Sequence, residues 1–354
     1  MRPMEINVVK VLIPAILSFA AGIALAPIVA HVLYKHKLWK KRARTEALGG
    51  GGTPIFNRLH KDKEVGTPRF GGIVIWASVF AAISLVWLIS VVFPSDVTKK
   101  LDFLSRNQTW LPLFTLIAAS LIGLADDALS VAGRGGYVAG GLPLKVRIGV
   151  VSLIGLVGAW WFYAKLGVSS IHIPFDGDLN MGILFIPFFM VVMLALFSGG
   201  VIDGIDGLAG GVMASAFAAY GIIAFSQQQI DLAAFCAVIV GGILAFLWFN
   251  VPPARFYMSE TGILGLTTTL AVVAFLTSSV PELLLIAFPL FAASGSVIIQ
   301  QLSKKLRHGR KVFLVAPIHH HFEALGWPGY KVTMRFWILS MMLSTFGVII
   351  ALVG

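Results

Sequence analysis

Six acidic residues lie at the ends of long apolar stretches, where a carboxylate is energetically expensive. They are Asp126, Asp127, Asp203, Asp206, Glu260 and Glu323. The chain has only 16 acidic residues against 27 basic ones, and 58% of it is hydrophobic. Ionisable groups at membrane spans usually mark a site that handles ions or substrate. If the spans alternate in direction, all six carboxylates reach the same side of the membrane, so we expect them to form one site.

Each acidic pair has a simpler explanation that stays open. Asp126 and Asp127 end an apolar stretch, where the helix dipole and their mutual repulsion disfavour the charged forms, so a cation would stabilise them. A solvated helix end is the alternative. Asp203 and Asp206 share a face if a helix begins there, although N-terminal capping could explain one of them. Capping alone could explain Glu260.

Three consecutive histidines, His319, His320 and His321, precede Glu323 in the last loop. Neighbouring residues on a helix point about 100° apart, so three in a row cannot all bind one metal ion. Binding phosphate or donating hydrogen bonds fits better, since histidine changes charge near neutral pH. An isolated cluster would be non-catalytic. Here the histidine cluster accompanies converging carboxylates, whose oxygens suit Mg²⁺. Together the two groups indicate a reaction on a phosphorylated substrate.

The elements that must position these residues are apolar stretches long enough to cross a bilayer, which takes about 20 residues each. Ten occur, at roughly 11–34, 71–93, 110–125, 148–164, 182–198, 208–225, 231–249, 262–280, 282–303 and 334–353. The sequence therefore predicts an all-α, polytopic membrane protein with about ten transmembrane helices and a single domain, 1–354. The one cysteine, Cys236, lies inside a stretch and is expected to serve packing.

The distribution of charge predicts the orientation. The net charge is +11, and 21 of the 27 basic residues fall on alternate loops that share one face. Cytoplasmic loops carry an excess of Lys and Arg, so this face is expected in the cytoplasm, with the active site there and both termini outside. The same pattern points to membrane lipid, and not nucleic acid, as the partner of the basic residues.

Four segments together resemble a known family. They are Asp126-Asp127, the DGIDGLA of 203–209, the FN-x-x-PA-x-x-x-M of 249–258, and the APIHHHFE-x-x-GW-x-x-x-K-V-x-x-RFW of 316–337. From about residue 60 onward, the chain resembles the phospho-N-acetylmuramoyl-pentapeptide transferase family. This family lies within the polyprenyl-phosphate N-acetylhexosamine-1-phosphate transferase superfamily. The first two segments indicate the superfamily, and the histidine segment favours this branch.

The resemblance implies an enzyme of the bacterial cytoplasmic membrane, with ten transmembrane helices and a cytoplasmic active site. It would transfer phospho-MurNAc-pentapeptide from UDP-MurNAc-pentapeptide to undecaprenyl phosphate in a Mg²⁺-dependent reaction, giving lipid I and UMP. Family members are often homodimers. By analogy the catalytic residues would be Asp126, Asp127 and His321. The substrate-binding residues would be Asp203, Asp206, Tyr257 (stacked on uracil), His319, His320, Lys145 and Asn250. The metal ligands would be Glu260, Asp127 and Asp203.

The chain departs from the family pattern around the expected nucleotide pocket. Glu260 replaces a metal-binding Asp, and Phe197 and Gly200 replace two Asn. The usual Thr-Pro-Thr-Met-Gly-Gly reads Thr67-Pro68-Arg69-Phe70-Gly71-Gly72, and Glu64 and Ser130 replace two Lys. These changes indicate a divergent member, with altered substrate contacts or reduced activity.

Three other readings stay open. A sister-branch transferase would move a different UDP-HexNAc phosphosugar onto a polyprenyl phosphate. A transporter or channel would carry its charges near the bilayer midplane, whereas these lie at one end. A catalytically weakened membrane scaffold is conceivable because of Glu260 and Gly200.

Overall fold

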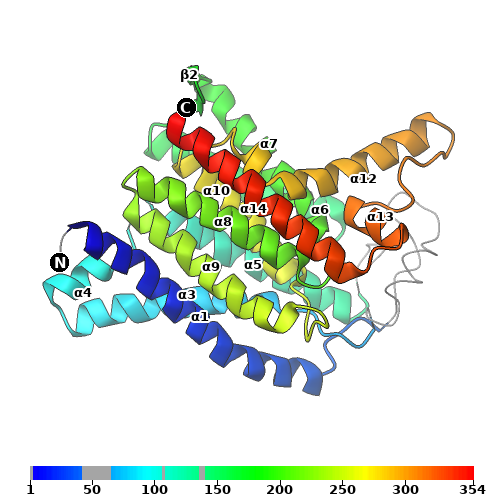
Figure 1. Ribbon diagram of the computed structural model, residues 1–354, viewed down its shortest axis with the longest axis horizontal. Coiled ribbons are helices and arrows are strands. Elements are labelled where there is room, and N and C mark those ends of the chain that lie inside the picture. The colour runs from blue at the N-terminus through cyan, green and yellow to red at the C-terminus, as the bar shows by residue number, and fades with distance from the viewer. Residues whose placement is uncertain (1–2, 42–64, 106–107, 135–139) are drawn as a thin grey trace.

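The computed structural model describes residues 3–41, 65–105, 108–134 and 140–354, and within them the chain forms a bundle of long helices (Figure 1). Nine helices in this described part are long and apolar enough to cross a membrane. Their bounds are α1 (Pro3–Lys35), α3 (Gly72–Val92), α5 (Trp110–Val131), α6 (Leu144–Trp160), α7 (Phe185–Gly199), α8 (Leu208–Ser226), α9 (Ile230–Asn250), α10 (Ser259–Leu276) and α14 (Gly329–Val353). The prediction of an all-α polytopic membrane protein is confirmed.

The predicted stretch at 282–303 takes a different form from the other nine. It divides into a single turn, α11 (Leu283–Ile286), and α12 (Phe288–Leu306), with Pro289 at the start of the second helix. α12 ends in Lys304 and Lys305 and buries Gln300, so it is more polar than the other long helices. It projects away from the bundle, and α13 (Ile318–Ala324) lies below it at the same end of the molecule, as Figure 1 shows.

Small elements complete the fold. α4 (Asp96–Leu101) follows α3, and a short π-helical turn (Trp161–Lys165) extends α6. Turns of 3₁₀ helix (Gly182–Leu184 and Gly200–Ile202) flank α7. Between α6 and α7, β1 (Ser170–Ile173) and β2 (Gly177–Asn180) form an antiparallel hairpin in which Ser170 lies opposite Asn180. The apolar pattern of residues 170–180 does not predict this hairpin.

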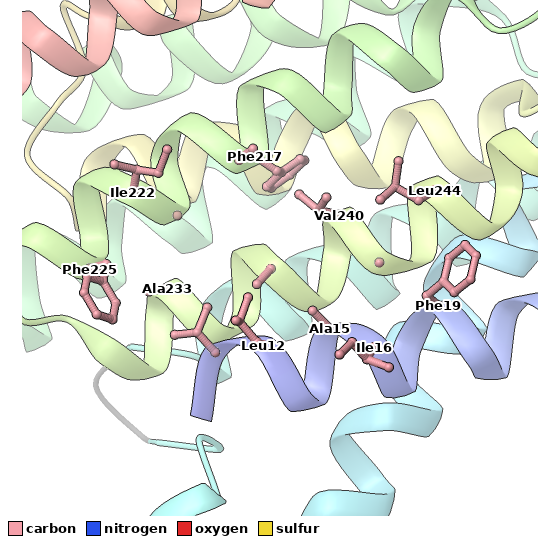
Figure 2. A pocket seen from close by; sticks show the side chains of 15 residues that line it. Leu12, Ala15, Ile16, Phe19, Phe217, Ile222, Phe225, Ala233, Val240 and Leu244 are labelled. Carbon is pink, nitrogen blue, oxygen red and sulfur yellow. The ribbon is translucent and has the colours of Figure 1, made fainter. Parts of the chain in front are cut away.

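The two termini lie at one end of the bundle, and α13 lies at the other (Figure 1). An apolar cavity of about 590 Å³ opens between α1, α8 and α9, lined by side chains such as Leu12, Phe217 and Val240 (Figure 2). None of the residues predicted to do chemistry lines this cavity. The acidic residues and the histidines therefore lie in another part of the bundle.

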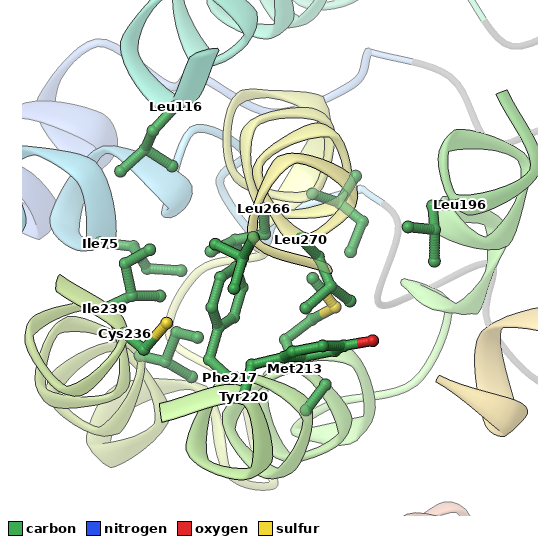
Figure 3. Packing of buried hydrophobic residues seen from close by; sticks show 14 of the residues in the cluster. Ile75, Leu116, Leu196, Met213, Phe217, Tyr220, Cys236, Ile239, Leu266 and Leu270 are labelled. Carbon is green, nitrogen blue, oxygen red and sulfur yellow. The ribbon is translucent and has the colours of Figure 1, made fainter. Parts of the chain in front are cut away.

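The central helix is α10, which is buried along nearly its whole length. Leu266 and Leu270 of this helix pack with Phe217 and Tyr220 of α8 (Figure 3). Cys236 is buried in the same core, as expected for a packing residue. Because neighbouring helices surround α10, its N-terminus is presented to several other elements at once.

Two glycines let neighbouring helices approach the start of α10 at backbone distance. A Cβ on Gly123 of α5 would lie 2.1 Å from the carbonyl oxygen of Glu260. A Cβ on Gly72 of α3 would lie 2.3 Å from the backbone nitrogen of Gly262. Any larger residue would push these helices apart, so the two glycines fix the distance between α10 and the elements that carry the acidic residues.

Candidate active site

The N-terminus of α10 gathers carboxylates from two distant parts of the chain. The backbone N–H of Ser259 donates to Oδ2 of Asp203 at 2.9 Å, and the N–H of Thr261 donates to Oδ2 of Asp127 at 2.9 Å. The first N–H groups of a helix have no partner inside it, and the helix dipole places partial positive charge there. Anionic groups are therefore stabilised at this position, and the helix start becomes the organising point of the site.

Asp127 is fully enclosed at this point. Its side chain has 0% exposure, and its second oxygen, Oδ1, accepts a hydrogen bond from Nε of Arg69 at 3.0 Å. The carboxylate thus bridges a guanidinium and a helix N-terminus. A buried charge is tolerated only when it is paired and hydrogen-bonded, and Asp127 meets both conditions.

The segment before α3 holds Arg69 in place through backbone hydrogen bonds to the segment before α10. The N–H of Tyr257 donates to the carbonyl of Pro68 at 2.9 Å, and the N–H of Gly71 donates to the carbonyl of Tyr257 at 2.8 Å. Phe70 adopts a left-handed conformation, with φ of 71°, that favours glycine. This tight connection sets Arg69 and Tyr257 beside each other at the start of α10.

Asp126 faces another way from its neighbour, because adjacent helical residues diverge by about 100°. It is buried, and Oδ1 accepts a hydrogen bond from the N–H of Leu142 at 2.7 Å. A Cβ on Gly141, which has φ of 90°, would lie 2.8 Å from Oδ2 of Asp126. Asp126 therefore shapes the loop before α6. The helix α5 continues to Val131, so neither Asp ends it as the sequence suggested.

Glu260 lies in the first turn of α10 and is partly exposed, with 21% of its side chain accessible. It forms an ion pair with Arg147 of α6, through Oε1 and Nη2. The Arg147 guanidinium also lies 5.5 Å from the ring centre of Phe197, one of the residues that depart from the family pattern. The first N–H groups of α10 donate to Asp203 and Asp127 and not to Glu260, so Glu260 is not an N-cap, although its place in the first turn is one that the helix dipole favours.

The carboxylates and arginines of this cluster influence one another. Burial is the largest cause that raises the pKa of Asp203, to about 6, and the nearby charges of Glu260 and Asp206 add to it. The N–H of Ser259 and the charge of Arg69 act in the opposite direction. For Arg69, burial lowers the pKa, but Asp127, Glu260 and Asp203 together outweigh it, so the net pKa is raised. Arg69 thus stands among three carboxylates.

The segment with Asp203 and Asp206 is not the start of a helix. α8 begins only at Leu208, after Gly207 adopts a left-handed φ of 77°. The two Asp therefore do not share a helix face. Asp206 accepts a hydrogen bond from the N–H of Ala254 at 3.2 Å, whereas Asp203 accepts one from the N–H of Ser259. Neither of them caps α8 through its side chain.

Asn250 ties this segment to the one before α10. Its Oδ1 accepts from the N–H of Gly207 at 2.9 Å, and its Nδ2 donates to the carbonyl of Phe256 at 2.8 Å. The side chain is buried. Both the oxygen and the nitrogen of the amide are hydrogen-bonded to backbone groups. The predicted substrate-binding residue Asn250 therefore stabilises the segments that carry the site.

The three histidines diverge, as their spacing predicts. His319 and His320 are buried against Gly204, where a Cβ would lie 2.8 and 2.7 Å from their Nε2 atoms. His320 shares a hydrogen bond of 2.7 Å with Glu323. His321 instead accepts from the N–H of Leu314 at 3.2 Å. Two of the three histidines thus border the loop that carries Asp203, and the predicted catalytic His321 faces the loop before α13.

The remaining predicted residues lie at the edge of the site or outside the described part. Tyr257 is half-buried beside Arg69, and Lys145 is exposed on α6, two residues before Arg147. Glu64 falls outside the described residues. Sequence reasoning missed Arg69 and Arg147 as site residues. The signal for Arg69 was available, since a cation replaces a neutral residue of the family pattern.

No three His, Cys, Asp or Glu side chains within the described ranges are already drawn together as a preformed metal site. The donor chemistry nevertheless fits Mg²⁺, which takes carboxylate oxygens and keeps several waters. Asp203 and Glu260 lie close enough for the charge of Glu260 to raise the pKa of Asp203, and a cation between them would remove that repulsion.

Comparison with known proteins decides the family. The family model for glycosyl transferase family 4 matches residues 109–278. The chain is 35% identical over 295 residues to the phospho-N-acetylmuramoyl-pentapeptide-transferase of Geobacillus thermodenitrificans, covering 81% of this chain and 85% of the relative. The enzyme of the same name from Chloroflexus aurantiacus is 31% identical over 328 residues, covering 89% and 85%. This chain belongs to the phospho-N-acetylmuramoyl-pentapeptide transferase family. It is a phosphotransferase and a multi-pass protein of the bacterial cytoplasmic membrane.

Membership of the phospho-N-acetylmuramoyl-pentapeptide transferase family excludes the hypothesis that the protein is a transporter or a channel. Of the residues predicted from the motifs, Asp127, Asp203 and Glu260 lie at the start of α10. His319 and His320 lie beside Gly204. Asp126, Asp206 and Asn250 instead bind neighbouring backbone groups. The residues that distinguish this chain, Arg69, Phe197 and Glu260, all lie in or against the same cluster. These three departures from the family pattern therefore include residues of the site itself.

Proposed function

We propose that the protein transfers phospho-MurNAc-pentapeptide from UDP-MurNAc-pentapeptide to undecaprenyl phosphate, with release of UMP and formation of lipid I. The observation that supports this most is that three carboxylates, one of them fully buried, and two arginines gather around one helix N-terminus. Such a site can stabilise a diphosphate and its leaving group. Family membership supports a nucleotide-sugar donor and a polyprenyl phosphate acceptor.

In this proposal the reacting groups are all phosphates. An oxygen of the lipid phosphate attacks the phosphorus that carries the sugar, and the bond between the two phosphorus atoms of the donor breaks, so UMP leaves. Asp203 and Glu260 would hold Mg²⁺, which would supply positive charge to the diphosphate. In this proposal Arg69 and Arg147, which pair with Asp127 and Glu260, also interact with phosphate oxygens.

Asp126 and Asp127 are our candidates for the group that takes a proton from the lipid phosphate. A two-step route would instead require an Asp to form a covalent phospho-sugar. Asp127 is 0% exposed and both its oxygens are hydrogen-bonded, so either route through Asp127 would first have to displace Arg69 or the N–H of Thr261, and its enclosure favours neither route. In this proposal His319 and His320, which lie beside Gly204, donate hydrogen bonds to phosphate.

The test is product formation by purified protein with UDP-MurNAc-pentapeptide or UDP-GlcNAc as donor, each with and without Mg²⁺. Lipid-linked product from the pentapeptide donor alone supports the proposal and shows that Glu260 is tolerated. Product from UDP-GlcNAc instead contradicts the donor that we propose. No product from either donor, in folded protein, contradicts the proposal and leaves the scaffold reading.

A further inference from the structure

Arg69 brings a fixed positive charge into the middle of the carboxylate cluster. Its Nε lies 3.0 Å from Oδ1 of Asp127, and its side chain is only 19% exposed. The other oxygen of Asp127 is held by the N–H of Thr261 at 2.9 Å. Both oxygens of this enclosed carboxylate are therefore engaged within the protein, and a cation could reach Asp127 only by displacing one of these partners.

The other carboxylates at the start of α10 are more accessible. Glu260 has 21% of its side chain exposed and pairs with Arg147 through Oε1, and Asp203 is partly buried, with Oδ2 held by the N–H of Ser259. Each is therefore held at one oxygen, whereas Asp127 is held at both. Divalent cations are bound by carboxylates that can turn an oxygen toward the ion and still leave room for water. Asp203 and Glu260 satisfy that requirement better than Asp127 does.

We propose that Arg69 is the internal counter-ion of Asp127, that it keeps this carboxylate out of the divalent-cation site, and that its charge lowers the affinity of that site. A cation then binds through Asp203 and Glu260. The inference rests on the proposed function, which supplies the cation. It makes Arg69 a positioning residue that acts through Asp127 and through the electrostatic field of the cluster.

Mn²⁺ binding to the purified protein, followed by the spectroscopic signal of free Mn²⁺ without nucleotide or lipid, tests the proposal. Arg69→Gln is expected to tighten Mn²⁺ binding by about tenfold or more, because a unit charge close to the ion is removed. Asp203→Asn is expected to weaken it by a similar factor. Arg310→Gln, the same charge change at an exposed position, serves as the matched control and is expected to leave the affinity unchanged.

The double variant Arg69→Gln/Asp127→Asn decides the role of Asp127. It removes both charges of the pair, so the proposal expects Mn²⁺ affinity within about threefold of wild type. Loss of binding in the double variant would make Asp127 a ligand and overturn the proposal. Unchanged or weaker binding in Arg69→Gln would also overturn it, because the guanidinium would then not oppose the ion.

Folding is checked by thermal unfolding of every variant. If Arg69→Gln unfolds because Asp127 is left without its partner, the neutral double variant and the charge-keeping Arg69→Lys carry the test. If the wild type binds no measurable Mn²⁺, binding gained in Arg69→Gln supports the proposal, and its absence overturns it. Failure to form lipid-linked product, with this binding pattern intact, counts against the proposed reaction alone.

Discussion

The two acidic pairs of this protein look alike in the sequence, yet the fold divides each of them in the same way. In both pairs one carboxylate, Asp127 or Asp203, accepts a backbone N–H at the start of α10. The other, Asp126 or Asp206, accepts an N–H from a neighbouring loop. The pairs reach this result by different means, since the first lies inside a helix and the second in a turn before one.

The difference between the pairs lies in what balances the charge. Asp127 is fully enclosed and has both oxygens engaged, by Arg69 and by the N–H of Thr261, whereas Asp203 is partly buried and has one oxygen held by the N–H of Ser259. A carboxylate with both oxygens engaged suits an internal support of the site. A partly exposed carboxylate with one oxygen engaged suits a cation ligand. Asp127 and Asp203 are the same residue type, so their different roles follow from how exposed each side chain is and from which N–H of α10 each accepts.

The largest expected effect is that of Asp127→Asn. Turnover is expected to fall about a thousandfold, because the variant removes a candidate proton acceptor and leaves Arg69 without its counter-ion. Asp126→Asn is the matched control, and a smaller loss is expected from it because Asp126 binds a loop N–H. Initial rates of lipid-linked product formation measure both. If Asp126→Asn lowers the rate as much as Asp127→Asn does, the two carboxylates do not have different roles.

Asn250→Ala is expected to destabilise the support that joins the two acidic segments. The backbone N–H of Gly207 and the carbonyl of Phe256 would lose their partner in a buried place, which costs about 2–4 kcal/mol in the free energy of unfolding. Thermal unfolding in detergent measures the loss. Asn180→Ala, at an exposed position of the hairpin, is the control. Equal stability of the two variants would show that Asn250 does not hold these segments.

The raised pKa of Asp203 predicts a pH dependence of stability. Its ordinary value is 3.8 and its value here is about 6, so the charged form is disfavoured in the folded protein. Without metal, the wild type is expected to lose stability relative to Asp203→Asn as pH rises from about 4 to above 6. After allowance for its partial exposure, the loss amounts to about 1–2 kcal/mol. A constant difference in melting temperature between pH 5 and 7.5 would contradict this prediction.

The smallest expected effect is that of Asp206→Asn. The amide oxygen of Asn can still accept from the N–H of Ala254, although a neutral acceptor binds more weakly than a charged one by about 1 kcal/mol. A rise in KM for the UDP-sugar of about fivefold, with kcat unchanged, is therefore expected. Steady-state kinetics beside Asp203→Asn measures it. A loss of kcat in Asp206→Asn as large as that in Asp203→Asn would remove the distinction within the second pair.

Much of the fold could be predicted from the sequence, because length and apolarity determine membrane spans directly. The exceptions have local causes. The stretch at 282–303 breaks near Pro289, and α12 takes in Gln300 and two Lys. The helix α5 runs past Asp127 to Val131 because no glycine or proline follows Asp127 before Gly133. The hairpin of 170–180 is too short to leave a signal in the periodicity.

The candidate site was harder to predict, because its contacts are long-range. Arg69 and Asp127 are 58 residues apart, and Asp127 and Thr261 are 134 apart, so no spacing rule joins them. The sequence could place Asp203 and Asp206 near each other but could not show that Gly207 delays the helix. The membrane side of the site and the ligands of the metal remain predictions.

The measurement that tests the central claim most directly is a time course of UMP and lipid-linked product in one reaction, with wild-type protein and Asp127→Asn side by side. The account predicts equal amounts of the two products from the wild type, dependence of both on Mg²⁺, and loss of both together in the variant. Release of UMP without lipid-linked product, or full activity in the variant or in the presence of a chelator, would contradict it.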